Sequence, residues 1–120
     1  MSIQIVGGSV SPSTALTLNA QTGTTYSFVL SDANNTLVTA SNASAQTYTI
    51  PPNSSVAYPV GSQINIIQIG AGQVSFAQGS GVTIASNGAT STAPKLRVQY
   101  SSATAIKVNT DSWYVVGDIA

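Results

Sequence analysis

Residues 74–84 have the sequence VSFAQGSGVTI, in which two short runs of alternating apolar residues flank a Gly-Ser-Gly break. Val74 and Phe76 fall on one face of the first run, and Val82 and Ile84 fall on one face of the second. Alternation with a period of two is typical of a β-strand with one buried face, and glycine-rich breaks are typical of turns. This stretch therefore predicts two strands joined by a short connection.

The same alternation recurs along most of the chain. Further apolar sets of this kind are Tyr26, Phe28 and Leu30; Tyr48 and Ile50; Leu96, Val98 and Tyr100; and Ile106 and Val108. Breaks rich in Gly, Pro and Asn separate these runs at intervals of about 8 to 12 residues, which suits a sandwich or a barrel. No segment sustains helical apolar spacing. We therefore predict an all-β fold, an antiparallel β-sandwich or jelly-roll-like barrel with almost no helix.

The domain organisation follows from the same pattern. At 120 residues the chain is long enough for one domain with one core. We predict that residues 21–120 form the β-sandwich domain and that residues 1–20 form an extended N-terminal arm or an edge strand. The N-terminus lacks the basic and apolar regions of a signal peptide, and no window is long and apolar enough for a membrane span. We therefore expect a protein made in the cytoplasm.

Two segments, residues 63–69 and 113–116, carry apolar residues on both faces of their predicted strands. A bulge within 63–69 would return its isoleucines to one face; otherwise both faces are covered. Trp113 and Val115 suit the core, which leaves Tyr114 and Val116 outward, although a single exposed aromatic residue is common. We take four side chains as a candidate subunit interface. They are Ile67, Ile69, Tyr114 and Val116.

The scarcity of charge is the second informative feature of the composition. Three Lys and Arg balance three Asp, whereas 48 residues are Ser, Thr, Asn or Gln. A freely soluble domain usually has a surface that is roughly a quarter or more charged. We therefore expect a surface that other protein covers through packing and neutral hydrogen bonds. A net charge of zero lacks the long-range attraction used by proteins that bind nucleic acid or anionic membranes, so neither is a predicted partner.

The residues that carry most enzyme chemistry are absent. The chain has no His, Cys or Glu, so it lacks an imidazole base and a thiolate. Asp32 lies in a predicted turn, where an aspartate hydrogen-bonds its own backbone. Asp111 and Asp118 bracket the last predicted strand as solubilising charges. We predict no catalytic, cofactor-binding or metal-binding residue and no enzyme activity; a calcium site made from the three aspartates and carbonyl groups is the remaining alternative.

Two other stretches have ordinary structural interpretations. Gly70-Ala71-Gly72 precedes a predicted strand and not a helix, so we expect a hairpin turn with positive φ instead of a phosphate-binding loop. Lys95 and Arg97 alternate with apolar residues and share one strand face. Two cations are too few for a nucleic-acid groove, so we expect a solvated face or a guard against unwanted strand pairing.

Several segments together resemble a known module. They are PPNSSVAYPVGSQINI at 51–66, GAGQVSF at 70–76, GSGVTI at 79–84 and DSWYVVGD at 111–118. Residues 22–120 resemble a small β-domain that recurs in virion proteins of tailed phages, in fibre-like and head-associated chains. The shared segments are turn and strand signatures without a catalytic residue. The resemblance therefore implies a structural module in a virion.

The place of the module in the chain suggests a role. Only about 20 residues precede it, whereas a fibre subunit would need a longer stalk, so the chain resembles a head decoration, or cement, protein. Such proteins sit as trimers on the capsid surface, which implies identical copies and the major capsid protein as partners. The alternative is a tail-fibre or receptor-binding tip that holds host glycans with Tyr48, Tyr58 or Tyr100. The alternation places Tyr48 and Tyr100 on the inward faces of their predicted strands, which favours a role in the core.

Overall fold

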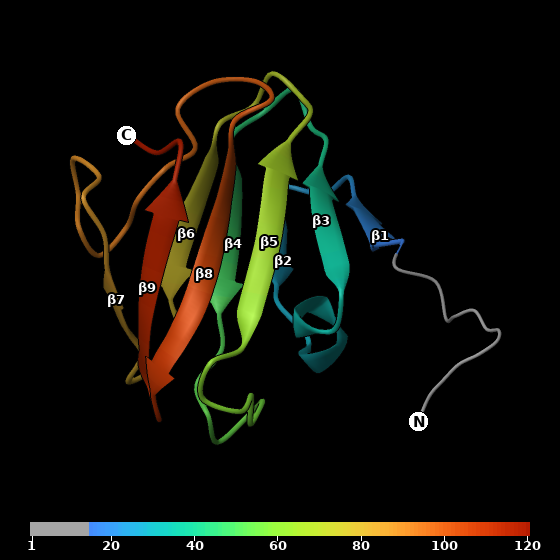
Figure 1. Ribbon diagram of the computed structural model, residues 1–120. Coiled ribbons are helices and arrows are strands. Elements are labelled where there is room, and N and C mark those ends of the chain that lie inside the picture. Colours follow the sequence, from blue (N-terminus) through green and yellow to red (C-terminus); the bar gives the residue numbers. More distant parts are fainter. Residues whose placement is uncertain (1–14) are drawn as a thin grey trace, which may run out of the picture.

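The computed structural model describes residues 15–120, which form an all-β body (Figure 1). The elements are β1 (Thr17–Gln21), β2 (Thr25–Ser27), the 3-10 helix η1 (Leu30–Ala33), β3 (Thr36–Ala40), β4 (Gln46–Ile50), β5 (Gln63–Gln68), β6 (Val74–Gln78), β7 (Thr83–Ala85), β8 (Ser102–Asn109) and β9 (Ser112–Gly117). The predicted all-β class with almost no helix is confirmed. No helix within residues 15–120 is long and apolar enough to cross a membrane.

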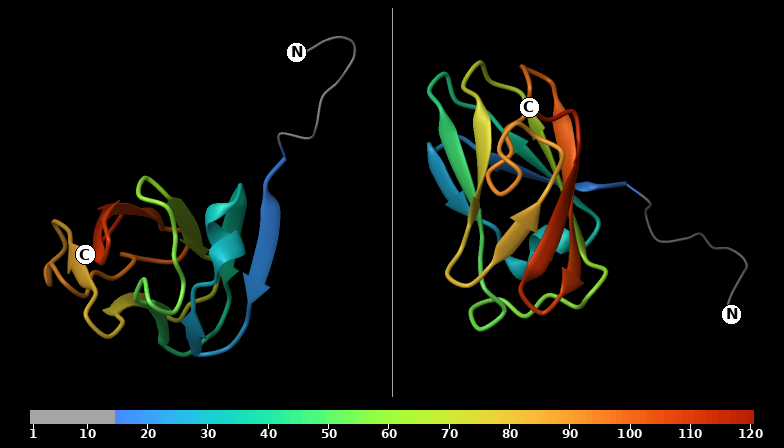
Figure 2. Two further views of the ribbon diagram at one scale, coloured as in Figure 1. Left: turned by 90° about the horizontal axis from the view of Figure 1, so that it is seen from below. Right: turned by 90° about the vertical axis from the view of Figure 1, so that its left-hand side faces the viewer.

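The strands form a six-stranded sheet in the order β1-β3-β5-β8-β9-β7 and a three-stranded sheet in the order β2-β4-β6. The first six strands alternate between the two sheets. From β3 to β6, each strand pairs in parallel with the strand two places earlier. The chain therefore winds as stacked turns of a flattened coil. Figure 2 shows the two sheets as separate layers, with β2, β4 and β6 on one side of the body and β8 and β9 on the other.

The predicted antiparallel pairing is wrong for most of the fold. Among the named strands of residues 15–120, β5–β8 and β8–β9 are antiparallel, whereas the other five pairs are parallel. An antiparallel jelly roll is therefore excluded for this part of the chain. A period-two pattern shows that a strand has one buried face, but it does not show which strand lies beside it. Here the connections between the first six strands cross to the opposite sheet, and only β8 turns back into its neighbour β9 as a hairpin among the described strands.

The core lies between the two sheets and is filled from both. Its largest fully buried aromatic side chains are Trp113, Tyr48, Phe28 and Phe76. Phe28, Tyr48 and Phe76 lie close together with Tyr26, and Tyr58 meets Trp113 edge to face at 5.3 Å between ring centroids. Offset and edge-to-face contacts of this kind add to the stabilisation from burial. The prediction that Trp113 and Val115 face the core is confirmed.

The C-terminal end of the chain joins the two layers. Gly117 has a φ of 139°, a backbone conformation that favours glycine, and the chain bends there after β9. Beyond it, Ile119 forms a bridge with Leu96, and Lys95 in turn forms a bridge with Ser75 of β6. The chain therefore passes from the six-stranded sheet toward the edge of the three-stranded one.

The segment Gly70–Gly72 is not the hairpin turn with positive φ that we expected. It connects β5 to β6 in the other sheet, and neither of its glycines has a positive φ. The Gly72 N–H donates to the Asn42 carbonyl at 2.8 Å, so this connection stacks on the one between β3 and β4. A Cβ atom at Gly70 would lie 2.5 Å from the Asn42 nitrogen, and one at Gly72 would overlap the Ser44 carbonyl. Close backbone approach therefore explains these glycines.

The predicted boundary at residue 20 falls within β1, which pairs with β3 and, among the strands of residues 15–120, lies at an edge of the six-stranded sheet. The start of the predicted N-terminal arm, residues 1–14, lies outside the described residues.

Gly72→Ala should lower the free energy of unfolding by about 1–3 kcal/mol, because the new methyl group must push apart two stacked backbone segments. Gly23→Ala is the matched control: its Cβ would meet only the Thr25 carbonyl, at an ordinary 3.7 Å, and should change stability by less than about 1 kcal/mol. Chemical denaturation followed by tryptophan fluorescence measures both. Equal effects of the two substitutions would contradict the stacking explanation.

Candidate protein-binding face

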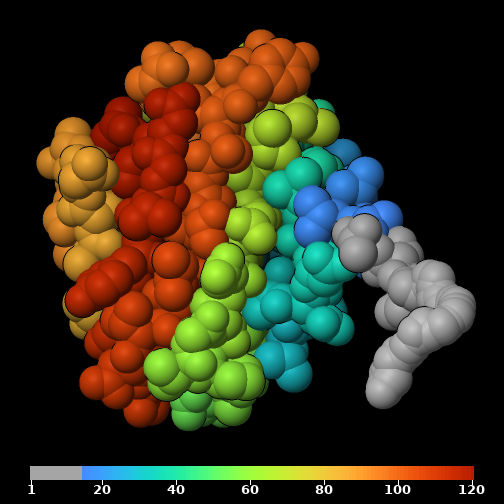
Figure 3. All heavy atoms as spheres, in the orientation of Figure 1, coloured from blue at the N-terminus to red at the C-terminus, as the bar shows by residue number. Residues whose placement is uncertain are grey.

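The candidate site is the surface of the six-stranded sheet that points away from the core, which we call the outer face. It is made of the outward side chains of all six strands. They are Leu18 and Ala20; Leu37 and Thr39; Gln63, Asn65 and Ile67; Ser102, Thr104, Ile106 and Val108; Ser112, Tyr114 and Val116; and Thr83 and Ala85. None of these residues carries a charge. Figure 3 shows the strands of this face side by side in a space-filling view.

Strand register places the apolar members of the outer face in rows. Leu18 is the partner of Leu37 across the β1–β3 pair, and Ile106 is the partner of Tyr114 across the β8–β9 pair. Ile67 lies between them, opposite Thr39 on β3 and Ser102 on β8. Cross-strand partners on one face of a sheet touch one another. The large apolar side chains therefore form one group on β1 and β3 and another on β8 and β9, with Ile67 of β5 between them beside hydroxyl and amide side chains.

Three of the four residues predicted as an interface lie on the outer face. Tyr114 is 53% exposed and Val116 is 50% exposed, while Ile67 is half-buried among its neighbours. Ile69 follows the end of β5, where its N–H donates to the Ala40 carbonyl and its carbonyl accepts a hydrogen bond from Gln99. The register of β5 continues without a bulge, so the isoleucines of this strand lie on both of its faces.

The inward side chains predicted for β8 and for the segment before it are wrong. Ile106 and Val108 do not enter the core, because Ala103, Ala105 and Lys107 occupy the inward positions of β8. Tyr100 is 68% exposed and has a φ of 70°, so it lies in a turn and not in the predicted inward phase. Two alanines and a lysine do not form the apolar alternation that predicts an inward face, so the sequence carries no signal for this one.

All six charges of the chain lie off the outer face. Asp32 and Lys107 are buried, whereas Lys95 and Arg97 are exposed on the segment that bridges to β6, opposite the buried Leu96. The prediction that the two cations share one face is therefore confirmed. Interfaces between proteins typically have a core depleted of charge and a polar rim. The distribution of charge in this chain matches that arrangement.

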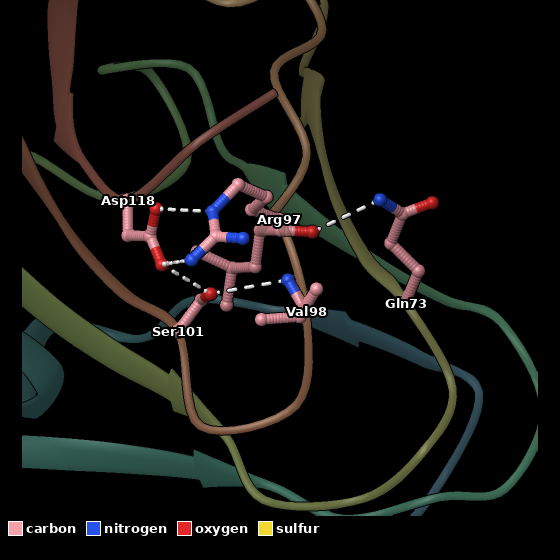
Figure 4. A network of polar contacts seen from close by, with 6 residues as sticks. Gln73, Arg97, Val98, Ser101 and Asp118 are labelled. Carbon is pink, nitrogen blue, oxygen red and sulfur yellow. Dashed lines mark hydrogen bonds and ion pairs between the residues drawn. The ribbon is translucent and has the colours of Figure 1, made fainter.

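The exposed charges at the edge of the body are paired with one another. The Arg97 guanidinium donates to both oxygens of Asp118, at 2.7 and 3.1 Å, and the Ser101 hydroxyl donates to the same carboxylate at 2.6 Å (Figure 4). The hydrogen bond from Arg97 is the main cause that lowers the pKa of Asp118, and the bond from Ser101 adds to it. The Asp118 carboxylate is therefore paired within the chain.

Asp32 is a structural residue, as the sequence predicts, but it does more than turn the chain. Its carboxylate accepts hydrogen bonds from the Val29 N–H at 2.9 Å, the Tyr26 hydroxyl at 2.7 Å and the Asn19 amide at 2.8 Å. These donors come from β1, β2 and the start of η1, so one buried carboxylate ties together the first turn of the coil. Burial, and next the hydrogen bond to Asp32, raise the pKa of Tyr26 to about 12.

The other two aspartates bracket β9, as predicted, and both are engaged within the chain. Asp111 accepts a hydrogen bond from the Asn53 N–H at 2.7 Å, which ties the β4–β5 connection to the β8–β9 turn. Within residues 15–120 the structure places no group of three or more His, Cys, Asp or Glu that could hold a metal ion. The three aspartates are therefore not gathered into the calcium site that was the remaining alternative.

An open groove of about 690 Å³ lies beside η1 and is lined by residues that do not belong to the outer face. Val29, Leu30, Ala33 and Pro59 supply most of its apolar lining, and Ser31, Asn34 and Ser62 supply hydroxyl and amide groups. No charged residue lines it. Its chemistry allows weak apolar contact, but it offers no acid, base or nucleophile pair.

Comparison of the chain with protein-family models, curated proteins and solved structures finds no match. The outer face and the charge distribution are therefore the observations from which a function can be argued.

Alkaline pH should destabilise the fold through its buried tyrosines. Burial raises the pKa of Tyr26 and of Tyr48 from 10.0 to about 12, and it raises the pKa of Tyr58 as well. The folded chain holds these protons more tightly than the unfolded chain, so their contribution to stability is complete below about pH 10 and is lost as pH rises toward 12.

Denaturation midpoints measured across this pH range should fall steadily, and Tyr26→Phe should make the fall shallower. An unchanged slope in that variant would show that the Tyr26 hydroxyl does not contribute to the effect.

Proposed function

We propose that this protein is a non-catalytic structural protein of a phage virion, a capsid decoration protein whose copies pack against one another through the outer face. The observation that carries the proposal is an uncharged outer face on a chain that has only six charged residues. An uncharged face with exposed Leu18, Tyr114 and Val116 gives water little to solvate and gives a protein partner a surface to pack on. The virion setting comes from the sequence resemblance of residues 22–120.

The mechanism is stabilisation by binding. A protein that binds an assembled shell, but not its separated subunits, shifts the equilibrium toward the shell by mass action, and many copies multiply the effect. Closed symmetry lets each copy bury the same face, and a trimer fits the three-fold positions of a capsid. The partners in this proposal are identical copies and the major capsid protein, on the outer surface of the head. We class the two-layer body with the β-sandwiches.

The second candidate is a tail-fibre or receptor-binding tip that contacts host glycans. Sugars are held by stacking on exposed aromatic rings together with neutral hydrogen bonds. Tyr100, 68% exposed on a loop, favours this candidate. Tyr48 and Tyr58 do not, because both rings are buried in the core and cannot stack on a ligand.

Electron microscopy of particles that carry the labelled protein separates the two candidates. The decoration proposal expects density over the whole head, repeated with the symmetry of the capsid. Density confined to the tail end would favour the glycan-binding tip and would refute the decoration role.

Attachment to the particle should survive high salt. Of the six charged residues, Asp32 and Lys107 are buried and Arg97 is paired with Asp118, which leaves few charges for ion pairs with the capsid. Such ion pairs are screened beyond about 3 Å at 1 M ionic strength. Particles washed in about 1 M NaCl should therefore keep the protein at the level found at about 0.1 M, as measured by gel densitometry of pelleted particles. Release that increases steadily with salt would mean that charged residues hold the protein in place.

A further inference from the structure

Lys107 is the one buried cation among the described residues. It occupies an inward position of β8, beside Trp113 on β9, and is 2% exposed. Its ammonium nitrogen Nζ donates to the side-chain oxygen of Asn53 and to the backbone carbonyl of Tyr58, both at 2.7 Å. The ion pair found within residues 15–120 joins Arg97 and Asp118, so no carboxylate lies within ion-pair distance of Lys107. The charge is therefore surrounded by neutral partners.

This arrangement is costly. Removing an ammonium group from water without a counter-charge is unfavourable, and two neutral hydrogen bonds offset only part of that cost. A buried lysine is usually paired with a carboxylate for this reason. Lys107 instead touches a primary carboxamide, the one partner in its surroundings with which an amine can form a covalent bond.

We propose that Lys107 and Asn53 condense to form an intramolecular amide bond that links β8 to the β4–β5 connection. The Lys107 ammonium first gives up one proton to solvent, and the neutral amine nitrogen then attacks the side-chain carbonyl carbon of Asn53. A new C–N bond forms, the C–N bond to the side-chain NH2 group breaks, and the ammonia that leaves takes up a proton. Starting from the ammonium form, an ammonium group and a carboxamide give a secondary amide and an ammonium ion. Charge and atoms balance, and no oxidant or other reactant is needed.

The surroundings of the two groups favour this reaction in three ways. The hydrogen bond of 2.7 Å holds the Lys107 nitrogen beside the Asn53 amide, so the entropy cost of bringing the two groups together is met by the fold. Asp111 accepts a hydrogen bond from the backbone N–H of Asn53, which holds the β4–β5 connection beside the end of β8. The buried rings of Tyr58 and Trp113 lie beside the lysine and limit the access of water. The product carries no charge, so condensation removes the cost of burying the ammonium.

Intact mass spectrometry of the purified full chain tests the proposal. The folded protein should be lighter than its sequence mass by one ammonia, and the unlinked fraction should shrink during incubation of the folded protein at mildly alkaline pH. Trypsin should not cut after Lys107 in the linked form. Asn53 and Lys107 should then appear in one branched peptide, identified by fragmentation. Lys107→Met and Asn53→Ala should keep their full sequence masses.

A control is needed because an asparagine can also lose ammonia by closing on its own backbone, and Asn87-Gly88 is a sequence prone to this. That product is hydrolysed at alkaline pH and leaves trypsin free to cut after Lys107, whereas the linked form resists both. A wild-type chain that keeps its full mass after prolonged incubation in the folded state would overturn the proposal. So would an ammonia loss in Lys107→Met that resists hydrolysis at alkaline pH.

Discussion

The rest of this structure depends on the close stacking of successive turns of the chain. The first six strands alternate between two sheets, and the connection through Gly70 and Gly72 lies against the backbone of residues 42–44. This contact leaves no room for a side chain, and it sets the parallel register of β3 with β5 and of β4 with β6. The register in turn decides which side chains fill the core and which form the outer face. A function argued from the outer face therefore rests on a backbone contact at the end of the sheets.

The placement of the few charged groups gives the outer face its character. Asp32 and Lys107 lie inside the body, where one carboxylate accepts three hydrogen bonds and one ammonium donates two. Arg97 and Asp118 neutralise each other at an edge. None of these charged side chains belongs to the outer face. Like charges across an interface are a common means of preventing association, and this face has none.

The sequence predicted the all-β class and the interior of β9, because alternation in Trp113 to Val116 assigns each side chain to a face without knowledge of its neighbours. It predicted Tyr114 and Val116 as outward residues for the same reason. It could not predict parallel pairing, since alternation is the same in either direction. It assigned Ile106 and Val108 to the core because two alanines and a lysine do not suggest an inward face. Leu18 and Leu37 were missed as members of the outer face, because only register shows that β1 and β3 extend it.

The networks around Asp32 and Lys107 could not have been foreseen either. Asn19, Tyr26 and Asp32 lie within one turn of the coil, but Asn53 and Lys107 are 54 residues apart, and nothing local marks them as partners. The resemblance pointed to the segment 51–61 as a recognisable signature. The structure gives the physical role of that segment: Asn53 and the Tyr58 carbonyl receive a buried lysine, and the Tyr58 ring packs on Trp113.

The central claim, that copies of this chain meet through the outer face, is tested most directly by sedimentation velocity at micromolar concentration. The account predicts that the wild-type chain sediments as an oligomer and that Val116→Lys, which places a charge on the outer face, sediments as a folded monomer. Val60→Lys, at a residue that is 65% exposed but lies away from that face, should behave as the wild type. A wild-type monomer, or a Val116→Lys variant that remains oligomeric, would contradict the claim.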